Sequence, residues 1–360
     1  IRQLSAHEVG HTLGFTHNFA ASTFGRASVM DYPAPLISID NGGGLDLSDA
    51  YGVGLGAWDL HAVRWAYTQS APGTDANEEL DGIIREGLET GLFILTDADA
   101  RPSGAANPLA NLWDNGADPV DQLEHDLRVR KIALGRFGER AIPKGMSMAK
   151  LEAVLVPLYL HHRYQLLAAA KVIGGLDYTH NLRGDGQTTS RFIDPGRQQR
   201  ALEAILSILE PEMLDLPETI LKDLLPGSGS SRELFAGRTD PVFDPLGAAA
   251  TAAEMAVAAV LQPERAGRLV DFHRRDPAQP GLEAVLDALN HKVFEEPGPS
   301  DERLAELRRV VQWVPVRGLI DLAVDPAAAA SVRSRVEASL EGLRTDLSAA
   351  PGAKGAEVAH

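Results

Sequence analysis

Three histidines, a glutamate and a glycine near the start of the chain restrict its fold more than any other feature: His7, Glu8, His11, Gly14 and His17. Residues four apart share one face of a helix, so His7 and His11 can bind one metal ion while Glu8 borders the same cavity. A continuing helix would point His17 away, so the chain must turn, and glycine tolerates the positive φ that such a turn needs. The spacing therefore predicts a helix, a turn at Gly14 and a three-histidine metal centre.

Zinc suits this ligand set, because it prefers tetrahedral coordination and three protein ligands leave a fourth position for the water that hydrolysis consumes. A glutamate beside that position can take a proton from the water, so we expect Glu8 to be the catalytic base. Two other interpretations compete: incidental histidines on a surface helix, and a degenerate site that binds zinc without turnover. The full pattern would arise by chance on the order of once in 10,000 such chains, which disfavours the first.

A second segment, residues 28–33 with the sequence SVMDYP, follows the third histidine closely. Together with the histidine pattern it resembles the metzincin metalloproteases, whose signature is H-E-x-x-H-x-x-G-x-x-H followed by a methionine turn. The resemblance implies that Met30 forms an apolar floor beneath the ligands without being one. It leaves two roles open for Tyr32. Astacins and serralysins carry a tyrosine there that approaches the metal and stabilises the oxyanion, and the alternative is a wall of the substrate pocket.

Residues 56–67 resemble the closing helix of a metzincin catalytic domain. Trp58, Ala62, Trp65 and Ala66 recur there at helical spacing. This periodicity predicts a helix that packs one stripe of side chains against the active-site helix.

Three short phrases make the chain resemble the Met-zincin domain family of bacterial exported zinc-dependent proteases: His-Asn-Phe at 17–19, Met-Asp-Tyr at 30–32 and Trp-Ala-Tyr at 65–67. The likeness continues at residues 111–119, 174–178 and 238–245. It implies a zinc-dependent endopeptidase with Zn²⁺ as its cofactor and a peptide or protein as its substrate. It also implies a protein that is secreted or lies in the periplasm or cell envelope.

Metzincin domains carry a twisted sheet before the active-site helix, and the edge strand of that sheet binds the substrate as an added strand. Only residues 1–6 precede the first ligand here. We therefore interpret the chain as the C-terminal portion of a longer parent protein, whose missing N-terminal half completes the cleft. On this interpretation the chain alone folds and binds zinc but cleaves peptides weakly.

The expected fold class is mainly α: the C-terminal half of a metzincin catalytic domain followed by a helical domain. The expected segments are the active-site helix, Met-turn and closing helix at 1–70, a connecting segment at 71–118 with a short strand at 92–95, a helical region at 119–225, a C-terminal helical region at 232–350 and a flexible tail at 351–360. Periodicity predicts further helices at 119–138, 147–173, 196–210, 245–261, 263–274, 279–294, 301–314 and 326–348.

Asp-Pro steps at 118–119, 194–195, 244–245 and 325–326 are predicted to start helices, because Asp accepts orphan N–H groups and Pro suits the first turn. Residues 226–231, rich in Gly and Ser, are the expected internal break. Asp97 and Asp99 invite a calcium interpretation, but Arg101 stands where a third oxygen ligand belongs. We therefore favour turn chemistry for that segment.

Composition limits the partners. A net charge of −16 without a cluster of Lys or Arg argues against nucleic acid, so no nucleic-acid partner is expected. The absence of cysteine excludes disulfides and thiolate metal ligands. The longest apolar run, at 246–261, is short and carries Glu254, so we expect a buried helix and no membrane span in this chain.

Two function classes remain open. In the first, an endopeptidase, Glu8 takes a proton from zinc-bound water and the resulting nucleophile attacks the peptide bond. In the second, a non-catalytic helical binding module, the zinc site is vestigial or structural. The intact Glu8 favours the enzyme, because a structural site needs no base. An open fourth zinc position would favour the enzyme, and a fourth protein ligand would favour the module.

Overall fold

The computed structural model describes residues 1–226 and 242–349, and it is mainly helical, which confirms the expected fold class. The chain divides into two compact units that interleave along the sequence. Unit 1 comprises Ile1–Arg136 and His161–Ile193, and unit 2 comprises the described parts of Phe137–Leu160 and Asp194–His360. The segments expected from the sequence follow the chain linearly and do not anticipate this interleaving. Residues 227–231 of the expected break, and the expected tail at 351–360, lie outside the described residues.

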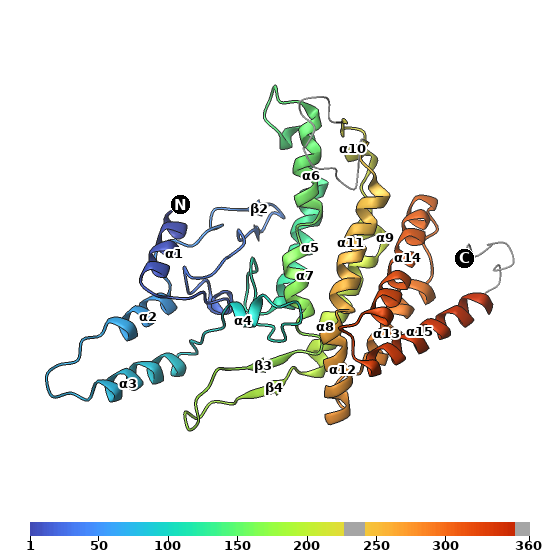
Figure 1. The fold of residues 1–360 in the computed structure, drawn as a ribbon. Helices are drawn as coiled ribbons and strands as arrows, with labels where there is room; N and C mark the ends of the chain where they lie inside the picture. The colour runs from blue at the N-terminus through green and yellow to red at the C-terminus, as the bar shows by residue number, and fades with distance from the viewer. Residues whose placement is uncertain (227–241, 350–360) are drawn as a thin grey trace. The chain divides into compact units, whose positions relative to one another are not determined.

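Figure 1 labels the elements, which we list by unit. Unit 1 contains α1 (Arg2–Thr12), η1 (Ala21–Phe24), β1 (Ser38–Ile39), β2 (Leu45–Asp46), α2 (Ala57–Tyr67), α3 (Ala76–Glu89), α4 (Asp97–Ala100), α5 (Pro119–Gly135), α7 (Arg163–Ala170), β3 (Leu176–Tyr178) and β4 (Ser190–Phe192). Its strands form two antiparallel pairs, β1 with β2 and β3 with β4.

Unit 2 is helical throughout its described part. It contains η2 (Glu139–Ala141), η3 (Met148–Lys150), α6 (Leu151–Tyr159), α8 (Pro195–Leu206), η4 (Ser207–Leu209), α9 (Pro211–Leu214), α10 (Glu218–Leu221), α11 (Pro245–Val260), α12 (Pro263–Arg275), α13 (Leu282–Asn290), the π-helical turn η6 (His291–Glu295), α14 (Glu302–Val324) and α15 (Ala330–Ala349).

Three of the four Asp-Pro steps begin helices as predicted. Asp118, Asp194 and Asp244 each accept backbone N–H groups at the start of α5, α8 and α11, with proline in the first turn. The fourth step was predicted wrongly. Asp325 is the C-cap of α14 with an extended backbone, and α15 begins only at residue 330. A residue before proline is pushed out of the helical region, so this step ends a helix.

Other local predictions also need correction. The expected helix at 147–173 is broken between α6 and α7, because Leu160 leaves the helical region at φ −99° and ψ 25°. Conversely, α14 continues through Pro315 to residue 324, beyond the expected end at 314. The segment expected to connect residues 71–118 contains the helix α3, whose N-terminus Asp75 caps. Its buried Ile83 and the capping aspartate are the signals that the sequence reading missed.

The strand expected at 92–95 is absent: that segment has no strand ladder within the described chain. Its backbone pairs instead with the loop after the third histidine. Leu95 O accepts a hydrogen bond from Phe19 N at 2.8 Å, and Phe93 O accepts one from Asn18 Nδ2 at 3.0 Å. The apolar run is buried as a core segment, with Phe19 and Leu95 fully buried in one cluster.

The closing helix forms as expected and anchors the methionine turn. Asp59, in the first turn of α2, is buried and accepts hydrogen bonds from Ser28 Oγ at 2.6 Å, Val29 N at 2.9 Å and Gly56 N at 2.7 Å. A Cβ at Gly56 would overlap the backbone of Ala27, so the two segments touch closely.

The packing partner of this helix differs from the prediction. α2 packs against α3, and contact with the active-site segment is made at the end of α2, where Tyr67 Oη donates to Leu13 O at 3.0 Å. Trp65 is 44% exposed and Ala66 is exposed, so the C-terminal half of the expected stripe is not buried.

In unit 2, the alanine-rich helix α11 packs against α14 (Figure 1). A Cβ at Gly318 of α14 would lie 2.9 Å from Val257 Cγ1, so the helices approach closely at that point. By length and composition alone, Pro245–Arg275 could cross a membrane. However, α11 has 16 residues and ends before α12 begins, whereas a span needs about 20 apolar residues. Burial of its alanines favours a core helix, as the sequence predicted.

Replacing Asp59 with alanine should destabilise unit 1 by about 3 kcal/mol, because buried donors in the methionine turn would lose a charged acceptor. Urea unfolding followed by circular dichroism measures this loss. Asp75→Ala is the matched control: Asp75 caps α3 through Asn77 N and Glu78 N at an exposed position, so its loss should cost about 1 kcal/mol. Equal costs for the two variants would show that Asp59 is an ordinary helix cap.

Candidate metal centre

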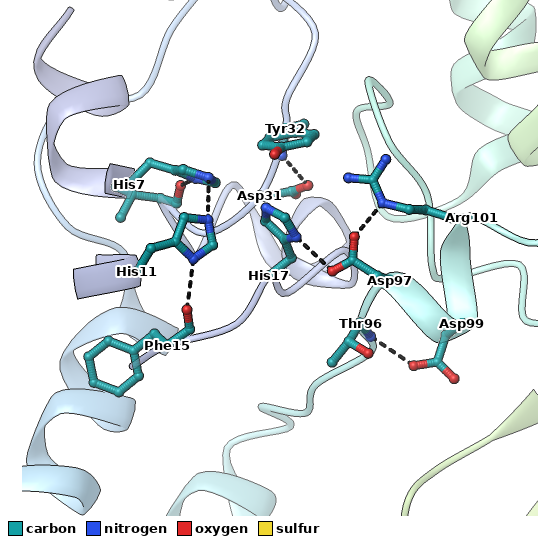
Figure 2. A network of polar contacts seen from close by, with 11 residues as sticks. His7, His11, Phe15, His17, Asp31, Tyr32, Thr96, Asp97, Asp99 and Arg101 are labelled. Carbon is teal, nitrogen blue, oxygen red and sulfur yellow. Dashed lines mark hydrogen bonds and ion pairs between the residues drawn. The ribbon is translucent and has the colours of Figure 1, made fainter. Parts of the chain in front are cut away.

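α1 and the turn that follows it bring three histidines together (Figure 2). His7 and His11 lie one helical turn apart on α1. Gly14 has a φ of +92°, which lets the chain fold back and return His17 to the same place, as the sequence predicted. One ligand nitrogen from each histidine lies within 4.8 Å of those of the other two.

The second ring nitrogen of each histidine is already used. His7 Nδ1 lies 2.7 Å from Val29 O, His11 Nδ1 lies 2.9 Å from Phe15 O, and His17 Nδ1 lies 2.7 Å from Asp97 Oδ2. A carbonyl or carboxylate oxygen can only accept, so each Nδ1 must carry the proton. In the neutral imidazole, Nε2 is then an unprotonated lone pair, which is the form that binds a metal.

The three Nε2 atoms fit a metal ion. His7 Nε2 and His11 Nε2 lie 3.0 Å apart, and neither has a proton to share if both Nδ1 atoms are protonated. His17 Nε2 is buried and has no hydrogen-bond partner among the described residues. Tetrahedral zinc with Zn–N bonds of about 2.05 Å separates its ligand atoms by ~3.3 Å, close to the His7–His11 spacing. A bound cation therefore satisfies lone pairs that would otherwise repel.

Met30 lies beneath α1, as the methionine turn predicts. Its side chain is 3% exposed, and a Cβ at Gly10 would overlap Met30 Sδ. The turn is fixed by Met30 N, which donates to Ser28 Oγ at 2.9 Å, and by Met30 O, which accepts from Asn18 N at 3.0 Å. Met30 thus contacts the helix on the residue between the two histidine ligands.

Tyr32 lies against the ligands and also lines a cavity. Its ring centroid is 4.7 Å from that of His17 and 5.2 Å from that of His7. The cavity, of about 530 Å³, is lined by His7, Tyr32, Pro33, Tyr51 and Trp113 among others. This placement agrees with the pocket-wall interpretation of Tyr32; an oxyanion role stays a prediction.

Trp113 is a wall residue that the sequence reading did not single out. Its φ is +57°, a left-handed conformation that a bulky residue rarely adopts. The indole stacks on Tyr32 with ring centroids 6.2 Å apart, and Trp113 N donates to Tyr32 O at 2.8 Å. Backbone strain of this kind clusters at functional sites, because the surrounding structure must hold it in place. No local sequence signal announces it.

Glu8, the expected base, follows His7 on α1 and is exposed to solvent. It lies about 100° round the helix from His7, at the edge of the ligand face. His11 is likewise exposed, whereas His7 is 4% exposed. The centre is therefore open to solvent on the side of Glu8 and His11.

Asp97 and Arg101 are the polar neighbours of the centre that the sequence reading missed. It noted Asp97 and Asp99 but interpreted them as turn residues. For Asp99 the structure confirms this: Thr96 N donates to Asp99 Oδ2 at 2.7 Å at the start of α4. Asp97, in contrast, bonds His17 and also accepts from Arg101 Nε. Burial alone would raise the pKa of Asp97, but the hydrogen bonds from Arg101 and His17 outweigh it and lower the pKa.

Two buried acids lie under the methionine turn. Burial raises the pKa of Asp31 to about 8, and the nearby Asp114 carboxylate adds to the rise. Burial also raises the pKa of Asp114 to about 6, although Ser22 Oγ donates to it at 2.9 Å. Asp31 Oδ1 accepts a hydrogen bond from Tyr32 N at 2.7 Å, so this acid holds the backbone beside the tyrosine.

The open three-histidine centre and the buried methionine beneath it define a zinc-metalloprotease type of domain. A family model described as Met-zincin matches residues 1–300, and the chain belongs to the Met-zincin family. The family implies zinc as the metal for the histidine cluster. No curated protein and no solved structure matches the chain.

Replacing His11 with alanine should abolish stoichiometric zinc binding, because two histidines cannot complete the ligand set. Elemental analysis after dialysis against buffer with trace zinc measures this. His61→Ala serves as the control, since His61 lies on α2 outside the ligand cluster and its loss should leave one zinc per chain. Full zinc occupancy in His11→Ala would contradict the assigned ligands.

Asp31→Asn should change the dependence of stability on pH. The folded pKa of Asp31 is raised from 3.8 to about 8, so its contribution to stability is fully present below pH 3.8 and is lost as pH rises through about 8. Asparagine mimics the neutral acid and still accepts from Tyr32 N. The variant should therefore gain stability relative to wild type between pH 4 and 8, on the order of a few kcal/mol. Urea unfolding at several pH values tests this, and parallel curves for the two proteins would refute it.

Proposed function

We propose that this protein is a zinc-dependent endopeptidase. The observation that carries the proposal is the set of three Nε2 lone pairs that converge while every Nδ1 is held by an acceptor. Beside them lie an exposed glutamate, one residue along from a ligand, and a cavity with aromatic walls. A metal centre, a base and a pocket are the parts that peptide hydrolysis needs.

In the proposed mechanism, His7, His11 and His17 hold the zinc ion. Zinc, when bound, supplies Lewis-acid polarisation of a carbonyl oxygen and eases deprotonation of water. The Glu8 carboxylate accepts the proton of the attacking water and then donates it to the nitrogen of the leaving amine. The Tyr32 hydroxyl donates a hydrogen bond to the carbonyl oxygen as negative charge develops on it.

The cavity beside His7 is the proposed binding place of the substrate. Its walls include the rings of Tyr32, Tyr51 and Trp113, and its rim includes Arg2 and Gln3. Aromatic walls bind apolar side chains, and holding the peptide beside the base supplies much of the rate of such a reaction. We propose a peptide or protein substrate and, in line with the resemblance, a location outside the cytoplasm or in the cell envelope.

The alternative, a binding module with a vestigial or structural zinc site, is less well supported. Structural zinc sites are usually closed by four protein ligands. Within residues 1–226 and 242–349, the cluster contains three histidines and no fourth His, Cys, Asp or Glu. The exposed positions of His11 and Glu8 leave the fourth coordination position to solvent, which favours the enzyme.

Glu8→Gln should retain zinc and lose peptide hydrolysis by at least about 100-fold, because an amide cannot accept the proton from water. Zinc content and cleavage of casein and of a mixed peptide library are measured on the same preparation. Glu89→Gln provides the matched control: the same chemical change at an exposed position of α3 in unit 1 should leave both quantities unchanged.

Wild-type turnover in Glu8→Gln would show that another group is the base. A wild-type protein that binds zinc stoichiometrically but cleaves nothing in either assay would favour the binding module.

A further inference from the structure

Asp97 links the metal centre to a distant part of unit 1. It is the first residue of α4, and 80 residues separate it from His17. One carboxylate oxygen, Oδ2, accepts from His17 Nδ1 at 2.7 Å, and the other, Oδ1, accepts from Arg101 Nε (Figure 2). We propose that Asp97 is a positioning residue that sets the tautomer and orientation of His17 and thereby the zinc affinity. The inference rests on the zinc centre of the proposed function.

His17 needs such support more than the other two ligands do. His7 and His11 are carried by α1, whereas His17 lies in the loop that follows the Gly14 turn. Its ring is held by stacking on Phe19, with centroids 4.9 Å apart, and by the hydrogen bond to Asp97. Without an acceptor at Nδ1, the ring could take its proton at Nε2 instead, and that proton must leave before a metal can bind.

His17 is also the one ligand of the three whose Nδ1 acceptor is charged. His7 and His11 donate to backbone carbonyls, of Val29 and Phe15. A carboxylate makes the stronger hydrogen bond and raises the basicity of the imidazole. The effect of removing it should therefore appear as weaker zinc binding.

Contacts that do not involve His17 hold Asp97 in place. Asp99 caps α4 through Thr96 N, and Tyr178 Oη donates to Asp99 Oδ1 at 2.8 Å. Arg101 orients the carboxylate from the other side, and its guanidinium carbon lies 5.5 Å from the ring centroid of Phe19. The acceptor is thus built into the fold before a metal binds.

The test compares the full 360-residue chain with Asp97→Ala, Asp97→Asn and a control, Asp177→Asn. Asp177 pairs with Arg191 at 2.7 Å on the β3–β4 hairpin, so the control removes a carboxylate from a similar ion pair away from the ligands. Competition with a chromophoric chelator measures the zinc dissociation constant. Asp97→Ala should weaken zinc binding by about 10- to 100-fold, Asp97→Asn should weaken it less because its carbonyl still accepts, and the control should match wild type.

A second readout separates positioning from general damage. Nitrogen NMR of ¹⁵N-histidine-labelled, zinc-free protein reports which ring nitrogen carries the proton, with His17 assigned by comparison with His17→Gln. Wild type and Asp177→Asn should show the Nδ1–H form, and Asp97→Ala should shift towards the Nε2–H form. Circular dichroism of each variant checks that it is folded, and if Asp97→Ala does not fold, Asp97→Asn decides.

The outcomes are distinguishable. A wild-type chain that binds no zinc would overturn the proposed function. A wild type that binds zinc, with Asp97 variants of equal affinity, would overturn the role of Asp97 and leave the metal centre intact. Weaker binding in those variants with an unchanged His17 tautomer would also overturn it, because the loss would then be structural.

Discussion

Hydrogen bonds to the three imidazole Nδ1 atoms are the constraint on which the rest of unit 1 depends. The acceptors lie 22, 4 and 80 residues away from the histidines that they hold. They come from the methionine turn, the turn after α1 and the short helix α4. A metal ligand is useful only when its second nitrogen is held in the right tautomer and direction. The centre therefore forms only when all three segments are in place, and much of unit 1 serves to place them.

How far the sequence predicts this centre depends on the distance over which each contact acts. The ligands and the Gly14 turn follow from helical periodicity and from the φ that glycine tolerates, which are local properties. Asp97 could be read from the sequence only as a turn residue, because its partner His17 lies 80 residues away. The same limit explains the strand predicted at 92–95. Its apolar side chains are buried as expected, but its backbone pairs with a loop, and no local pattern distinguishes the two.

Unusual polar and strained groups converge on Tyr32. Its backbone N–H donates to Asp31, an acid whose pKa burial raises to about 8, and its carbonyl accepts from Trp113, which has a positive φ. Lys171 is buried nearby in unit 1 and donates to the carbonyls of Ala100 and Ala110. Each feature costs stability when taken alone. Departures of this kind from ordinary core packing are expected where a residue must be held for function, and the tyrosine beside the ligands is the residue that they hold.

The source of the order in this centre separates metal binding from folding. In small zinc domains the metal supplies the folding free energy, and the ligands are disordered without it. Here the ligand loop is fixed by packing, because Phe19 is fully buried in a cluster with Leu95 and its backbone pairs with that residue. Changes in that cluster should therefore affect folding and zinc binding together. Changes in the Nδ1 acceptors act on the ligand nitrogens, so they can alter zinc affinity while the core stays intact. The division follows from where each group lies: the core cluster shapes the loop, and the acceptors orient the rings that the loop carries.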